Sequence, residues 1–92
     1  MYQIIYSNNF RKDLKRVSRS GRFQQEKLEY LICLLNLDVP LPAQYKNHKL
    51  QGEYKDLYEC HVYPDMLLIY EKDCEFKLIT LMELGNHSEL FG

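Results

Sequence analysis

The run Met66–Tyr70, M-L-L-I-Y, is the most apolar segment of the chain and constrains the fold more than any other feature. A short continuous apolar run is typical of a central strand. Pro64 and Asp65 precede it, and another strand-like run ends just before them. A tight turn at Pro64–Asp65 predicts an antiparallel pair with His61 and Asp65 at the same end. We expect a functional site there, at an edge of the sheet.

The residues before Pro40 predict one strand and two helices. Apolar residues at positions 2, 4 and 6 alternate as in a short strand. Apolar residues then recur at helical spacing from Phe10 to Val17 and from Arg22 to Asn36. Ser20–Gly21 separates these segments, and we expect the two helices to form a hairpin.

The residues from Pro40 onward predict a linker and three strands. Pro40-Leu41-Pro42 excludes a helix and favours extended backbone. Strand patterns follow at residues 54–62, 66–71 and 75–82, with a turn at Lys72–Asp73, and Gly85 begins a short tail. An N-terminal strand, a helical hairpin and then antiparallel strands in one small sheet predict a single α+β domain over residues 1–92.

Charge is distributed unevenly, although the formal net charge is only -1. From Glu53 onward, acidic residues outnumber lysines. The first helical segment is basic, with only Asp13 opposing six positive charges: Arg11, Lys12, Lys15, Arg16, Arg19 and Arg22. A polyanion would be attracted to one part of this surface and repelled from another. The basic helix predicts contact with RNA or the ribosome, and an ordinary solvated face is an equally good interpretation.

Cysteine usage and hydropathy indicate the cellular compartment in which the chain is expected. Cys33, Cys60 and Cys74 are odd in number and form no C-x-x-C, which argues against a disulfide framework and a thiolate zinc site. We expect reduced, mostly buried thiols. No apolar run approaches the ~20 residues of a membrane span, and the first residues do not resemble a secretory leader. The chain is therefore expected to be cytoplasmic, without membrane contact.

All three histidines, His48, His61 and His87, lie in the second half of the chain. Histidine exchanges protons near neutral pH, and an adjacent carboxylate such as Asp65 fixes its tautomer. This set predicts acid–base catalysis without a cofactor. Zinc is an alternative ligand, but no H-x-x-x-H or H-x-H spacing supports it. For each histidine taken alone, a surface or structural role is the simpler interpretation.

Three motifs resemble the YafQ-like branch of the RelE superfamily of bacterial toxins. They are P-L-P-A-x-Y-K-x-H-x-L-x-G at Pro40–Gly52, C-H-V-x-P-D-x-L-L-I-Y at Cys60–Tyr70 and G-x-H-S-E-L-F at Gly85–Phe91. The resemblance implies a RelE-like α+β fold and an endoribonuclease toxin, an mRNA interferase, of a type II toxin–antitoxin system. It implies cleavage of mRNA on the ribosome without metal or cofactor, and inhibition by a cognate antitoxin. DNA contact is implied only indirectly, through the antitoxin.

By motif position, the resemblance implies catalytic roles for His48, His61, Asp65 and His87. His87 is the best candidate for the general acid, and Asp65 or His48 for the base that takes the 2'-hydroxyl proton. His61 would support the phosphate or orient Asp65. The predicted RNA contacts are an aromatic residue and six cations: Phe91, Lys46, Lys49, Lys12, Lys15, Arg16 and Arg19.

Two positions depart from the pattern of the family. Glu83 stands where the family usually has an arginine, and Tyr58 precedes Glu59 where an arginine is frequent. Phosphoryl transfer concentrates negative charge in its transition state, so both departures weaken its stabilisation. Lys49 is the candidate substitute cation. The alternative function is a RelE-fold antitoxin-binding protein or operon co-repressor with weak or no nuclease activity.

Overall fold

The computed structural model describes residues 1–52 and 56–92. The chain begins with a strand and two helices and continues into the remaining strands and a terminal helix. The elements in order are β1 (Gln3–Tyr6), α1 (Asn8–Ser18), α2 (Gln25–Leu37), the 3₁₀ turn η1 (Ala43–Tyr45), β2 (His48–Lys49), β3 (Leu57–Tyr63), β4 (Met66–Asp73), β5 (Leu78–Gly85) and α3 (His87–Phe91).

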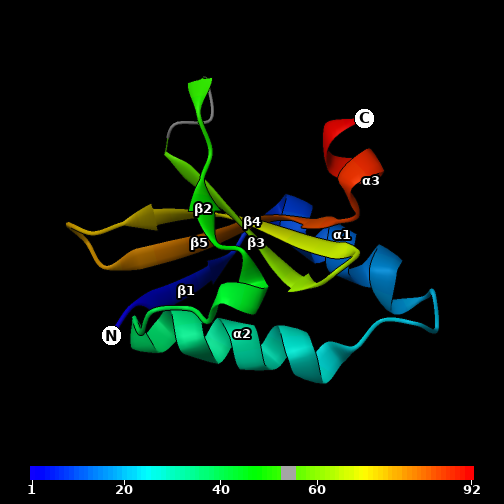
Figure 1. Ribbon diagram of the computed structural model, residues 1–92, viewed down its shortest axis with the longest axis horizontal. Helices are drawn as coiled ribbons and strands as arrows, with labels where there is room; N and C mark the ends of the chain where they lie inside the picture. Colours follow the sequence, from blue (N-terminus) through cyan, green and yellow to red (C-terminus); the bar gives the residue numbers. More distant parts are fainter. Residues whose placement is uncertain (53–55) are drawn as a thin grey trace.

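The strands form one mixed sheet in the order β1-β5-β4-β3-β2. Strands β2 to β5 pair antiparallel, whereas β1 pairs in parallel with β5. The predicted α+β class, with late antiparallel strands in one small sheet, is confirmed. Figure 1 shows α2 on one side of this sheet, with the β2 segment and α3 rising on the other.

The run Met66–Tyr70 forms the central strand β4, as predicted, and Leu67–Tyr70 are all buried. The helical stripes are also confirmed. Core residues of α1 and α2 join side chains from the facing strands in one cluster, and these helical residues are Phe10, Val17, Leu28, Leu31 and Leu35. The core therefore lies between the two helices and one face of the sheet.

The helices pack on different strands: α1 lies against β5, whereas α2 lies against β1 and β3. Ser7 begins α1, because its side chain accepts a hydrogen bond from the Phe10 amide. Asp38 adopts a left-handed conformation that ends α2, and Pro40 prevents continuation. No helix among residues 1–52 and 56–92 is long and apolar enough to cross a membrane.

The predicted turn at Lys72–Asp73 is wrong, because β4 continues through Asp73 and β5 begins only at Leu78. The Asp73 side chain accepts hydrogen bonds from the amides of Glu75 and Phe76, and this moves the turn to residues 74–77. The predicted start of the preceding strand at residue 54 lies outside the described residues. That strand, β3, is seen from Leu57.

Two other expectations are corrected. The predicted tail after Gly85 is the short helix α3, which Asn86 caps. Only Cys60 is a buried thiol, whereas Cys33 and Cys74 are exposed. Cys33 lies on α2 outside its buried stripe, and Cys74 lies in the turn at residues 74–77.

Candidate active site

Strand pairing places histidine and carboxylate side chains on one face of the sheet. His48 of β2 pairs with Glu59 of β3, Glu59 with Ile69 of β4, and Ile69 with Glu83 of β5. Directly paired residues point to the same face. His48, Glu59 and Glu83 therefore form one row across the sheet, which we call the carboxylate row.

His61 lies on the same face, two residues beyond Glu59 on β3. It is diagonal to His48, a relation that separates two residues by roughly 7–8 Å. His61 pairs with Leu67, and Leu67 pairs with Gly85 at the end of β5. Two strand spacings, about 10 Å, thus separate His61 from Gly85. His61 lies between the carboxylate row and the start of α3.

His48 is held by contacts on both ring nitrogens. Its Nδ1 donates to the carbonyl of Lys46 at 2.8 Å, because a carbonyl oxygen can only accept. Its Nε2 lies 3.5 Å from Oε1 of Glu59. Glu59 is a buried carboxylate, with only 8% of the residue exposed to solvent. Sequence reasoning missed Glu59 as a site residue. Its two-residue spacing from His61 in a predicted strand was the available signal, since such residues share a face.

A buried tyrosine anchors the segment that carries His48. The Tyr70 hydroxyl donates to Oδ1 of the neighbouring residue Asn47 at 2.7 Å. Burial raises the pKa of the Tyr70 phenol, so the hydroxyl keeps its proton and stays a donor. This hydrogen bond connects the residue just before β2 to the central strand β4.

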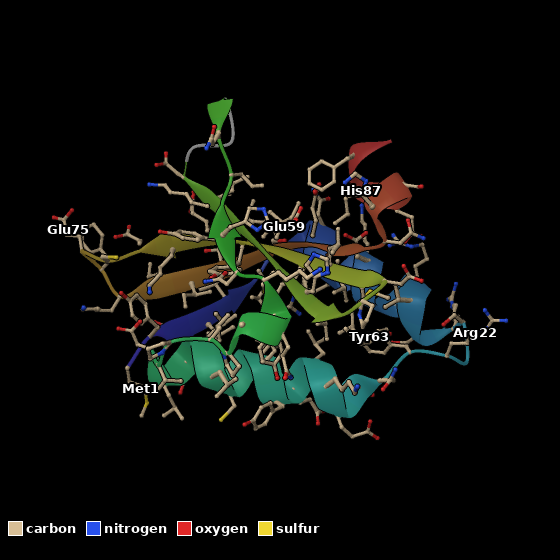
Figure 2. All side chains as sticks on the ribbon, in the orientation of Figure 1. Met1, Arg22, Glu59, Tyr63, Glu75 and His87 are labelled. Carbon is tan, nitrogen blue, oxygen red and sulfur yellow. The ribbon has the colours of Figure 1, made fainter. Side chains whose placement is uncertain are left out.

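Asp65 and His87 line a common hollow of about 650 Å³ between the β3–β4 turn, α3 and the loop after α1. Tyr63 and Met66 flank Asp65 in this hollow, and Asn86 lies beside His87. In Figure 2, His87 lies on α3, and Glu59 lies towards the centre of the sheet. The four predicted catalytic residues thus fall into two groups, His48 with His61 on the sheet face and Asp65 with His87 in the hollow.

The position of His87 depends on the cap of α3. The Asn86 side chain accepts from the Glu89 amide at 2.8 Å, and the Glu89 side chain accepts from the Asn86 amide at 2.8 Å. This capping box begins the helix at His87. One turn later Phe91 packs against His87, with ring centroids 5.1 Å apart. His87 and the predicted stacking residue Phe91 therefore act as one aromatic pair.

The predicted cationic contacts lie in different places. Lys12, Lys15 and Arg19 are exposed residues of α1 or its end, and Lys46 is exposed just before β2. Lys49 pairs with Tyr58, so it points to the face opposite the carboxylate row. Arg16 differs from the others, because its guanidinium contacts Asp13, Leu84 and Glu89.

The described part of the chain contains no group of three or more histidine, cysteine, aspartate or glutamate side chains arranged to hold a metal ion. The chemistry that this site offers is proton transfer and hydrogen bonding by histidines and carboxylates.

Comparison with known proteins identifies relatives over almost the whole chain. The family model described as the bacterial toxin of type II toxin–antitoxin system, YafQ, matches residues 2–92. The chain is 42% identical to the mRNA interferase toxin YafQ of Escherichia coli K12 over 90 residues, covering 97% of this chain and 95% of the relative. YafQ in the crystal structure of the E. coli DinJ–YafQ complex superposes with a TM-score of 0.87 at 41% identity, covering 100% of each chain. A metal-bound toxin from Helicobacter pylori superposes with a TM-score of 0.90 at 41% identity, covering 99% of this chain and 100% of that one.

The fold, the site and these likenesses define a class, the small α+β toxins of bacterial type II toxin–antitoxin systems. Within that class the chain belongs to the YafQ family, as its three motifs predicted.

Proposed function

We propose that the chain is an mRNA interferase, a ribosome-dependent endoribonuclease toxin whose cognate antitoxin neutralises it. One observation carries the proposal: His48 and His61 share a sheet face with Glu59, beside a hollow that contains Asp65 and His87. The names of the E. coli relatives, an mRNA interferase toxin and a toxin bound to DinJ, support the same function. The reaction takes place on ribosomes and is therefore cytoplasmic, and DNA contact would come only through the antitoxin.

Cleavage needs one base and one acid. The ribose 2'-oxygen attacks the adjacent phosphorus while Asp65 or His48 takes the 2'-hydroxyl proton. The bond from phosphorus to the 5'-oxygen breaks as His87 protonates the leaving oxygen, which gives a 2',3'-cyclic phosphate and a 5'-hydroxyl. His61, between the two groups of site residues, hydrogen-bonds the phosphate. Side chains supply both proton transfers, so the reaction requires no metal or cofactor.

The RNA would extend from the sheet face over α3. Phe91 stacks on a base next to the scissile phosphate, and its contact with His87 couples base binding to the acid. Lys46 lies beside the His48 segment and contacts the backbone of the RNA. Lys12, Lys15 and Arg19 attract the ribosome or the antitoxin to the outer surface of α1. Lys49, on the opposite face, contacts RNA only outside the site.

The test is His87→Ala in a translation reaction with purified toxin. General acid–base catalysis contributes ~10²–10⁴ in rate, so cleavage should fall by at least about a hundredfold. The urea midpoint should change little, because His87 is exposed at the start of a short terminal helix. If the His87→Ala variant is as toxic as the wild type, His87 is not the general acid. Loss of cleavage by wild-type toxin that was treated with a chelator, and freed of the chelator before it was added to the reaction, would point to a metal-dependent hydrolase instead.

The second candidate is a RelE-fold protein that binds antitoxin but cleaves RNA weakly. The carboxylate row favours it, because Glu59 and Glu83 both place negative charge on the proposed phosphate face. Antitoxin binding with no mRNA cleavage by properly folded wild-type protein would select this candidate.

A further inference from the structure

The end of β5 is held by side chains of α1. The Leu84 amide donates to Oδ2 of Asp13 at 2.9 Å, and Nη2 of Arg16 donates to the Leu84 carbonyl at 2.9 Å. A salt bridge of 2.7 Å joins Arg16 Nη1 to Asp13 Oδ1. β1 ends opposite Leu81, so within residues 1–52 and 56–92 no strand pairs with Leu84 on that side. Asp13 and Arg16 supply the hydrogen bonds that a further strand would have made.

The same arginine also holds α3. Its Nε lies 3.1 Å from Oε2 of Glu89, while Oε1 of Glu89 accepts from the Asn86 amide in the capping box. One carboxylate thus closes the cap of α3 and binds α1. We call Asp13, Arg16, Leu84 and Glu89 the Arg16 clamp. The charges of Asp13 and Glu89 raise the pKa of the Arg16 guanidinium, with the Asp13 hydrogen bond the largest cause.

Because Gly85 has no side chain, Arg16 and Glu89 of the clamp can occupy the space beside it. A Cβ atom at this position would lie 3.0 Å from Arg16 Nη2, 3.0 Å from Glu89 Oε1 and 3.3 Å from Glu89 Cβ. The guanidinium and the carboxylate therefore pack directly over the last residue of β5. This contact fixes the junction from which Asn86 and His87 continue.

We propose that Arg16 is a positioning residue for His87, holding α3 at the angle at which the imidazole meets the leaving oxygen. The inference rests on the proposed nuclease function. The five residues of α3 are too few to be stable as an isolated helix, so its orientation depends on tertiary contacts. Arg16 supplies the ion pair from α1 to the capping box, two residues beyond His87 in sequence.

This role differs from the RNA contact that the sequence predicted for Arg16. All three guanidinium nitrogens are already engaged, by Asp13, the Leu84 carbonyl and Glu89. An RNA contact would affect binding and its salt dependence. A positioning contact acts on the rate of the chemical step, and only while His87 is present.

The experiment compares Arg16→Met in the wild-type and His87→Ala backgrounds by steady-state and single-turnover cleavage of ribosome-bound mRNA. Small misplacements of reacting groups can cost up to ~10²-fold, so kcat should fall about tenfold to a hundredfold with KM nearly unchanged. In the His87→Ala background, Arg16→Met should cause no further loss. Equal losses in both backgrounds, or a rise in KM alone, would overturn the proposal.

Arg11→Met is the matched control. Arg11 lies on the same helix and also donates to a backbone carbonyl, with Nε 3.2 Å from the oxygen of Tyr6 at the end of β1. Its kcat should stay within about twofold of wild type. Glu89→Ala removes both acceptors and should reproduce the loss of kcat, so it tests the contact even where Arg16→Met does not fold. Glu89→Gln keeps one accepting oxygen, so it can keep the capping bond from the Asn86 amide while its NH2 group cannot accept from Arg16 Nε, and its kcat should fall as in Arg16→Met.

Amide hydrogen exchange in residues 88–92 provides a readout that is independent of nuclease activity. Arg16→Met should accelerate exchange there by at least about fivefold while β4 stays protected. Unchanged exchange in α3 would overturn the clamp as a positioning device. If wild-type protein cleaves no mRNA while exchange responds as expected, the proposed function fails and the clamp stands as a determinant of the α3 position.

Discussion

At the scale of single residues, the carboxylate row has a chemical consequence. Glu59 and Glu83 lie on either side of Ile69 on the proposed phosphate face. Glu59 has His48 within 3.5 Å, whereas no ion pair of Glu83 is seen among the described residues. The resemblance to the YafQ-like toxins implies an arginine at the position that Glu83 occupies. The charge of Glu83 would therefore oppose the negative charge that develops in the proposed phosphoryl transfer.

We predict that Glu83→Arg raises the single-turnover cleavage rate roughly tenfold to a hundredfold, because a donor to a developing oxyanion is worth ~3 kcal/mol. Lys49→Ala is the paired test. Lys49 points to the other face, so the two substitutions should have additive effects. A smaller effect of Lys49→Ala in the arginine variant would instead identify Lys49 as the substitute cation. No gain from arginine would mean that Glu83 does not limit the reaction.

At the scale of secondary-structure elements, the start of α1 joins the helix to a bulge in the sheet. The Ser7 side chain accepts from the Phe10 amide at 3.0 Å and donates to the Met82 carbonyl at 3.1 Å. Met82 lies where the pairing of β4 with β5 shifts register, between the partners of Ile69 and Tyr70. One hydroxyl thus caps α1 and satisfies a carbonyl at an irregular point of β5.

Ser7→Ala should lower the free energy of unfolding by about 1–2 kcal/mol, since it removes an N-cap together with a bond to the sheet. Urea denaturation at constant pH measures this change. Ser18→Ala is the matched control: its hydroxyl bonds only within α1, to the Leu14 carbonyl at 2.7 Å, and the change should be below about 0.5 kcal/mol. Equal losses in both variants would show that the capping role of Ser7 is unimportant.

At the scale of the whole molecule, the basic and site-bearing surfaces come from different parts of the chain. The exposed cations belong to α1, which packs against β5 and buries Phe10 and Val17 in the core. The carboxylate row crosses β2 to β5 on the other face of the sheet. Arg16 is the exception on α1, because its charge is used inside the fold.

Replacing Lys12, Lys15 and Arg19 together by Gln, with Arg16 retained, should leave the melting temperature within a few degrees, because solvated charges contribute little to stability. Binding to ribosomes or to the antitoxin should weaken and become less dependent on salt. Separate binding assays with ribosomes and with the antitoxin, each at several salt concentrations, show which partner these cations bind. Unchanged binding to both would leave these cations as an ordinary solvated face.

Thiol labelling reports on the core. Burial raises the pKa of Cys60 to about 12, whereas Cys33 and Cys74 are exposed. With a thiol reagent at neutral pH, two cysteines should react rapidly and the third only at the rate of global unfolding. As pH rises above the ordinary thiol range, the unfolded chain loses the Cys60 proton first, so stability should fall there. Rapid labelling of all three thiols would contradict the buried position of Cys60.

The sequence by itself determined what depends on neighbouring residues. The apolar run at Met66–Tyr70 predicted a central strand, and helical spacing predicted the buried stripes of α1 and α2. The three motifs identified the family and its candidate site residues. The Asn86–Glu89 spacing is also a capping-box signal, so the start of α3 is encoded locally in a segment that was predicted to be a tail.

Only the tertiary structure decided what depends on residues distant in the chain. The parallel pairing of β1 with β5, the row that aligns Glu59 with Glu83, and the contact of Arg16 with Glu89 each join segments that no local pattern relates. Local propensity can specify an element but not its neighbour. The neighbour is selected by how the whole chain buries its apolar faces and satisfies its backbone hydrogen bonds.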